Sequence, residues 1–230
     1  MSVTANEPRR PRGPRGRLDG LERFGRGRTQ LEGLLLLGGI VALMWLIEVI
    51  NTVDSNGLDG EGIYARNLDR IWGILTSPFI HASFQHLTDN TIPFVFLGAI
   101  IALRGAARLA MVTGLIIVLG GLGTWLISPS TSMGHPVDTI GASGVVFGYA
   151  SYLVARGFFD RSLLELAIGA IVGVVWGAVL ISSLIPHQGV SWQAHASGAV
   201  AGVIVAWRLS QRDHRGRRAS KPAAAQQASA

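Results

Sequence analysis

Six apolar stretches, most of them about 20 residues long, constrain this chain more than any other feature of its sequence. An α-helix needs about 20 predominantly apolar residues to cross the hydrocarbon core of a bilayer. The stretches follow one another closely and are 32–52, 81–103, 107–128, 141–157, 163–185 and 190–209. The pattern predicts an all-α polytopic membrane protein with six transmembrane helices.

The composition of the chain agrees with a membrane protein. Charged residues make up 15% and hydrophobic residues 49% of its 230 residues, whereas a soluble domain carries about 25% charged residues. The mean hydropathy is +0.39. Cysteine is absent, which excludes disulfides and thiolate metal sites. The histidines and carboxylates also lack metal-ligand spacing, so we expect neither a metal nor an organic cofactor.

The two ends of the chain differ in composition from the apolar part. Residues 1–30 are rich in Arg, Pro and Gly, and residues 210–230 are basic and rich in Ala. We expect both to be disordered cytoplasmic tails that flank one membrane domain at 31–209. A cleaved signal peptide is the alternative for residues 1–50. The apolar stretch there is too long and ends in no small-residue cleavage pattern, which favours an uncleaved first span.

The distribution of Lys and Arg predicts the orientation of the helices. A net charge of +6 would suggest nucleic-acid binding in a soluble protein, but basic residues of membrane proteins concentrate in cytoplasmic segments. If the N-terminus is cytoplasmic, 18 of the 20 Lys and Arg lie on the cytoplasmic side, in the two tails, at Arg208 just before the second tail, and in residues 104–108 and 156–161. We therefore expect a multi-pass protein of the cell membrane with both termini in the cytoplasm and no nucleic-acid partner.

Ser143 is a polar residue within the fourth apolar stretch, and such residues are costly in a membrane. It is expected in the first turn of its helix, where backbone N–H groups are unpaired and the helix dipole is positive. One interpretation is packing, because Gly144 and Gly148 form a small-xxx-small pattern that lets helices approach closely. The other interpretation is a nucleophile.

His195 lies near the outer end of the sixth stretch. Alone, it could be an ordinary hydrogen-bonded core histidine. It is followed by Gly198 and Gly202, a second small-xxx-small pattern that would let two helices nearly touch. At a rise of about 1.5 Å per residue, Ser143 and His195 both lie within roughly 10 Å of the outer surface. A hydroxyl and an imidazole at matching depth predict a nucleophile and its general base.

A third polar cluster begins the second stretch. His86 and Asn90 are four residues apart and therefore share one helix face. Both side chains can donate hydrogen bonds, as an oxyanion hole requires, although they could also bind another helix or a water. His81 is expected to have a structural role near the preceding loop. For Asp89 we expect a structural hydrogen bond to Gln85, or a protonated carboxyl.

A third member of a catalytic triad is missing from the sequence. No Asp or Glu occurs between Glu165 and Asp213, so no carboxylate can reach His195 from its own helix. We expect a Ser–His dyad in which desolvation keeps the buried imidazole neutral and available as a base.

These residues resemble the rhomboid family of intramembrane serine proteases over about residues 31–209. The resemblance rests on "GASG" at 141–144, on "SPFIHASFQHLTDN" at 77–90 and on "AHASGAVAG" at 194–202, in the expected order. It implies a six-transmembrane-helix rhomboid-like bundle that cleaves other transmembrane proteins. Substrates would enter sideways past the fifth span and under the loop before the sixth, "PHQGVSW".

The resemblance also implies the roles of individual residues. Ser143 would be the nucleophile and His195 the general base, while His86, Asn90 and the Ser143 N–H would stabilise the oxyanion. The supporting residues would be Gly141, Gly144, Phe147, Gly198 and Gly202. Phe147 stands where the family often has a Tyr that stacks on the histidine, so the stacking is retained and the hydroxyl is lost. The Trp-Arg pair common in the family's long outer loop is also absent.

Two other functions fit parts of the sequence. A catalytically inactive rhomboid-like protein would bind membrane helices without cutting them, but such proteins typically lose the serine or the histidine. A transporter or proton relay could use Asp89, His86 and His195. No repeated halves are evident, and the polar groups cluster near the outer end of the helices. The partners expected are transmembrane substrates and the lipid bilayer. The physiological substrate and the oligomeric state stay open.

Overall fold

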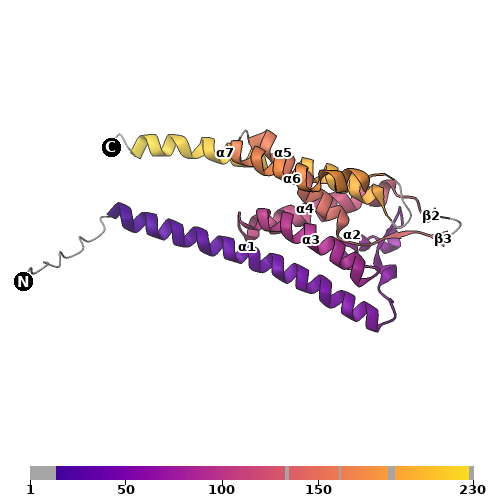
Figure 1. Ribbon diagram of the computed structural model, residues 1–230. Coiled ribbons are helices and arrows are strands. Elements are labelled where there is room, and N and C mark those ends of the chain that lie inside the picture. The colour runs from indigo at the N-terminus through magenta and orange to yellow at the C-terminus, as the bar shows by residue number, and fades with distance from the viewer. Residues whose placement is uncertain (1–13, 133–134, 161, 186–189, 228–230) are drawn as a thin grey trace, which may run out of the picture.

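A computed structural model describes residues 14–132, 135–160, 162–185 and 190–227. It is a bundle of long helices with shorter elements gathered at one end (Figure 1). The long helices occupy the six apolar stretches in order and are α1 (Pro14–Val53), α3 (Phe84–Ala102), α4 (Ala106–Ile127), α5 (Ser143–Asp160), α6 (Leu163–Ser182) and α7 (Trp192–Gln227).

Short elements fill the two longer connections. Those between α1 and α3 are η1 (Asp59–Glu61), β1 (Ile63–Tyr64), η2 (Leu68–Arg70), α2 (Gly73–Thr76) and η3 (Ser77–Phe79), and those between α4 and α5 are β2 (Thr131–Ser132), β3 (His135–Pro136) and β4 (Asp138–Thr139). Strands β2 and β3 form an antiparallel hairpin. Strand β1 pairs antiparallel with β4, with Ile63 opposite Thr139. This pair ties the first connection to the segment that leads into α5.

Apolar side chains cover the outside of the bundle. By length and composition, Gly27–Val53 and Ala106–Ile127 are each sufficient to cross a membrane. Large apolar side chains point outward on other helices as well, such as Val174 of α6, which is 84% exposed. Such extensive apolar exposure is unusual for a soluble monomer and marks a surface that contacts lipid or protein. The fold is therefore an all-α bundle of the membrane type.

Helix α5 lies at the centre of the bundle and packs against α3, α4, α6 and α7. Its Tyr149 and Tyr152 are fully buried. The closest approach is to α7, where a Cβ added at Gly198 would overlap the carbonyl group of Gly144, and one added at Gly202 would overlap that of Gly148. The predicted contact between the two small-xxx-small patterns is thus confirmed.

The ends of the chain are more helical than the sequence predicts. Helix α1 begins at Pro14 and α7 ends at Gln227, so both helices extend into segments expected to be disordered tails. Proline is favoured in the first turn of a helix. Because each extension continues an existing helix, no new helical turn has to be nucleated. The remaining tail residues, 1–13 and 228–230, lie outside the described part of the chain.

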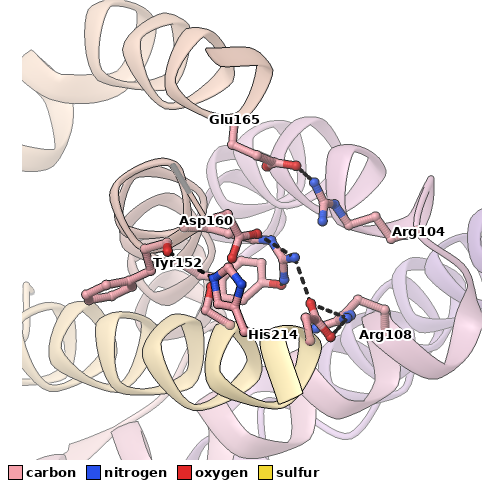
Figure 2. A network of polar contacts seen from close by, with 10 residues as sticks. Arg104, Arg108, Tyr152, Asp160, Glu165 and His214 are labelled. Atoms are coloured by element: carbon pink, nitrogen blue, oxygen red, sulfur yellow. Dashed lines mark hydrogen bonds and ion pairs between the residues drawn. The ribbon is translucent and has the colours of Figure 1, made fainter. Parts of the chain in front are cut away.

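The start of α1 and the end of α7 lie at the same end of the bundle, and the β2–β3 hairpin lies at the other (Figure 1). Two groups of ion pairs lie at the end of the bundle where α5 finishes (Figure 2). Buried Arg156 of α5 and Arg108 of α4 both donate to Asp213 of α7, with closest distances of 2.9 Å. Arg104, just before α4, pairs with Glu165 of α6. These arginines, which the sequence shows only as topology signals, are therefore also paired with carboxylates.

Candidate active site

Ser143 and His195 meet where α5 and α7 begin. Ser143 is the first residue of α5, and His195 is the fourth residue of α7. The His195 Nε2 atom lies 3.0 Å from the Ser143 Oγ atom, within the range expected of a nucleophile and its base. His195 is only 6% exposed. The structure thus brings together the two residues that the sequence predicts as a dyad.

The other ring nitrogen of His195 contacts a backbone carbonyl. Its Nδ1 atom lies 2.8 Å from the Ser183 carbonyl oxygen, just after α6. A carbonyl oxygen can only accept a hydrogen bond, so Nδ1 carries the proton and Nε2 presents its lone pair to Ser143. This is the tautomer that a general base needs. The role of Ser183 could not be predicted from the sequence, because a backbone carbonyl has no residue signature.

The ring of Phe147 fixes the face of the imidazole. Its centroid lies 4.2 Å from that of His195, and the two ring planes differ by 5°. Phe147 is one helical turn after Ser143, so the same helix supplies the hydroxyl and the stacking ring. The predicted stacking is confirmed. Together with the Ser183 carbonyl, it holds the imidazole by one edge and one face.

The turn before Ser143 is held by η3 and by the loop that follows η3. Gly141 has a φ of +107°, a conformation that glycine adopts without steric cost. Its N–H donates to the Ser77 carbonyl oxygen at 2.8 Å. The N–H of Ala142 donates to His81 Nε2 at 3.3 Å. Ser143 follows directly, in the first turn of α5, where N–H groups have no acceptor within the helix.

His86 and Asn90 both reach this turn from α3. The Ser83 hydroxyl caps α3 by accepting from the His86 N–H at 3.2 Å, and the Asn90 Nδ2 atom donates to the His86 carbonyl oxygen at 2.8 Å. A Cβ added at Gly141 would lie 2.8 Å from the imidazole of His86 and 3.9 Å from Asn90 Nδ2. The two candidate oxyanion donors therefore lie close to the residues that precede Ser143.

Two further expectations concern neighbouring polar residues. The predicted contact of Asp89 is confirmed, since Gln85 Nε2 donates to its Oδ1 atom at 2.8 Å. His81, expected to be structural, is fully buried. Its ring meets that of His86 edge to face at a centroid distance of 5.1 Å. His81 thus contacts both the turn before Ser143 and a candidate oxyanion donor.

A cavity of about 30 Å³ borders the turn that carries Ser143. Gly141, Gly144, Ser77 and Thr124 contribute to its wall, while Ser143 and His195 do not. It is large enough for one or two water molecules. Of the loop expected to cover the substrate, residues 186–189 lie outside the described part of the chain.

Residues 68–212 match the family model described as the Rhomboid domain. The chain is similar to the uncharacterized protein Rv1337 of Mycobacterium tuberculosis, with 42% identity over 180 residues, or 77% of this chain and 75% of that protein. It is 40% identical over 184 residues to ML1171 of Mycobacterium leprae, with coverages of 76% and 72%. Rhomboid-like protein 11, chloroplastic, of Arabidopsis thaliana is 26% identical over 164 residues, covering 63% of this chain and 55% of that protein.

Proposed function

We propose that this chain, which belongs to the rhomboid family, is an intramembrane serine endopeptidase that cuts transmembrane segments of other membrane proteins near their outer ends. The observation that carries the proposal is the 3.0 Å contact of Ser143 Oγ with His195 Nε2, in an imidazole whose Nδ1 atom is bound to a carbonyl. The atoms are arranged for proton transfer from the hydroxyl to the ring.

The first half of the reaction forms an acyl-enzyme. Ser143 Oγ attacks the carbonyl carbon of the scissile peptide bond while His195 Nε2 takes the hydroxyl proton. The resulting tetrahedral oxyanion accepts hydrogen bonds from the Ser143 N–H, His86 and Asn90. The C–N bond then breaks, and the His195 imidazolium gives its proton to the leaving amine. Ser143 is left as an ester of the N-terminal substrate fragment.

The second half of the reaction consumes one water molecule. His195 Nε2 removes a proton from the water as its oxygen attacks the ester carbonyl. The same donors stabilise the second oxyanion. When the ester bond breaks, the proton returns to Ser143 Oγ, and the product carries a new carboxyl terminus.

The depth of the dyad defines the region of the substrate that is cut. We assign six spans, with both ends of the chain in the cytoplasm, from the six long helices and the Lys and Arg distribution. Ser143 and His195 then lie close to the outer surface. A peptide bond in a regular helix is shielded, so the substrate must unwind locally before attack. Gly lowers the cost of unwinding by about 1 kcal/mol relative to Ala.

The residue at the cut is expected to be small, because Gly141, Ala142 and Gly144 flank the nucleophile closely. The experiment uses the purified protein and a panel of single-span substrates with Gly, Ser or Pro near their outer ends. Wild type should cut them after a small residue, as mass spectrometry would show, and Ser143→Ala should not. Replacing the helix-breaking residues by Leu should sharply reduce cleavage.

The same assay separates this function from the alternatives. An inactive relative would bind the substrates and leave them intact. A transporter would move solute or protons across vesicles in a Ser143-independent way. Cleavage that persists in Ser143→Ala, or a cut near the cytoplasmic end of the substrate, would refute the proposal.

A further inference from the structure

The last turn of α1 is connected to the active site by hydrogen bonds. Helix α1 lies entirely outside residues 68–212, which match the Rhomboid domain. Its residue Asn51 is nevertheless fully buried. A buried amide inside an apolar bundle is costly unless its donors and acceptor are satisfied, so the partners of Asn51 show what it holds in place.

The Asn51 side chain contacts two segments of the following connection. Its Nδ2 atom donates to Asp59 Oδ1 at 2.7 Å and to the His81 carbonyl oxygen at 3.4 Å. Its Oδ1 atom accepts from the Leu58 N–H at 2.9 Å. One amide therefore links the end of α1, the start of the connection and the loop before α3.

His81 connects Asn51 to the proposed catalytic groups. It lies in a loop outside any helix or strand, so side-chain contacts rather than a ladder of backbone bonds must hold it. Its Nε2 atom accepts from the N–H of Ala142, the residue before Ser143. Its ring also packs edge to face on that of His86. A shift of His81 would therefore disturb both the nucleophile turn and a proposed oxyanion donor.

We propose that Asn51 is a positioning residue of the active site, which holds the backbone of His81 and through it the turn that carries Ser143. The inference rests on the proposed proteolytic function. It assigns α1, which contributes no catalytic group, a direct part in the geometry of catalysis. Asn51 touches neither the substrate nor the reacting atoms.

The variant that tests this role is Asn51→Leu, which keeps the branched shape and removes all three side-chain hydrogen bonds. Asn51→Asp is less suitable, because it would add a carboxyl group beside Asp59 and one turn after buried Glu48. The matched control is Thr52→Ala, at the next position on α1, where the side chain is exposed. Asn51→Gln keeps an amide group on a side chain that is one methylene longer. It is the variant to test if Asn51→Leu does not fold.

The measurements are kcat and KM on a cleaved substrate, the rate of Ser143 labelling by a fluorophosphonate, and the thermal midpoint of each purified protein. A displaced catalytic group can cost about 10²-fold in rate. We expect Asn51→Leu to lower kcat and the labelling rate of folded protein by tenfold or more, with KM little changed. Asn51→Gln should lower both less, and Thr52→Ala should match wild type.

A double variant tests whether Asn51 acts through His81. If it does, Asn51→Leu combined with His81→Ala should be no slower than His81→Ala alone, because residues in one network are not additive. Labelling of folded Asn51→Leu at the wild-type rate would overturn the inference. Where Asn51→Leu does not fold, labelling of Asn51→Gln at the wild-type rate would overturn it, and losses that multiply in the double variant would also overturn it.

The same experiment distinguishes failure of this inference from failure of the proposed function. If wild type is neither labelled at Ser143 nor able to cut a substrate, the proteolytic function is refuted. If wild type is labelled and active, but the Asn51 variants are equally so, only the positioning role is refuted.

Discussion

The imidazole of His195 is oriented by a neutral backbone carbonyl instead of a carboxylate. The Nδ1 contact with Ser183 at 2.8 Å selects the tautomer. A carbonyl dipole stabilises the imidazolium of the transition state less than the negative charge of a triad carboxylate would. In the proposed mechanism, the charge that develops on the substrate would then be stabilised mainly by the candidate oxyanion donors, so His86 and Asn90 are expected to contribute strongly to the rate.

Removing one oxyanion donor should therefore slow turnover without removing the nucleophile. We expect Asn90→Ala to reduce kcat by about 10²–10³, the loss found when one such donor is deleted, and His86→Ala to behave comparably. Both variants should retain a labelled Ser143, as intact-mass spectrometry would show.

The control is Thr88→Ala on the same helix, since the Thr88 hydroxyl bonds only to the Phe84 carbonyl among the described contacts. It should keep the wild-type rate. A wild-type kcat for Asn90→Ala would show instead that Asn90 is a packing residue.

Side chains of the site could be predicted from the sequence, whereas its backbone partners could not. The sequence positions of Ser143 and His195 predict the same depth in the membrane, and Phe147 follows Ser143 by one helical turn. The acceptor for Nδ1 is the carbonyl of residue 183, and every residue has a carbonyl. The contact between His81 and the Ala142 N–H likewise depends on how two loops meet in space.

At the scale of elements, the dyad depends on the contact between α5 and α7. An added methyl group at Gly198 would overlap the Gly144 carbonyl, one residue beyond the nucleophile. We expect Gly198→Ala to push α7 away from α5, to abolish cleavage and to lower stability by about 1–3 kcal/mol, as overpacking does. The thermal midpoint and the cleavage rate are measured on the same preparation.

Gly173→Ala on α6 is the matched control, because a Cβ added there has no neighbour within 4 Å. It should leave both the midpoint and the rate unchanged. An active Gly198→Ala protein would mean that the close approach of α5 and α7 is not what brings Ser143 to His195.

The long helices could be predicted from apolar length alone, but the connection between α1 and α3 could not. Strands of two residues, such as Ile63–Tyr64, are too short to show a periodicity of two. Their pairing with Asp138–Thr139 joins residues more than 70 positions apart in sequence, which no local pattern reveals.

The ion pairs where α5 ends should make stability depend on pH. Burial alone would raise the pKa of Asp213, but hydrogen bonds from Arg156 and Arg108 and their positive charges lower it below its ordinary value of 3.8. A carboxyl whose pKa is lower in the folded than in the unfolded protein stabilises the fold at pH values above its pKa in the unfolded protein. This stabilisation is lost as the pH falls through its pKa in the folded protein.

We therefore expect Asp213→Asn to lower the thermal midpoint at neutral pH. The difference from wild type should shrink as the pH falls below 3.8, the ordinary pKa of Asp. Midpoints of both proteins in the same detergent across this range give the comparison. A difference that grows on acidification would contradict the assigned direction of the pKa shift.

At the scale of the whole molecule, the six membrane passes that we propose would place the dyad near the outer surface and both termini in the cytoplasm. Reporter fusions at Arg28 and Arg218 should report the cytoplasm, and one at Ser130, between α4 and β2, should report the outside. Termini on opposite sides would refute six spans. In the proposed orientation, the Arg104–Glu165 and Arg108–Asp213 pairs would lie at the cytoplasmic end of the bundle.

The most direct test of the central claim, that His195 activates Ser143 as a nucleophile, is covalent labelling of the purified protein by a fluorophosphonate with peptide mass spectrometry to locate the adduct. Wild type should carry one adduct, on Ser143. Ser143→Ala should carry none, and His195→Ala should react far more slowly while remaining folded. Labelling of His195→Ala at the wild-type rate, or an adduct on another residue that persists in Ser143→Ala, would contradict the Ser143–His195 dyad.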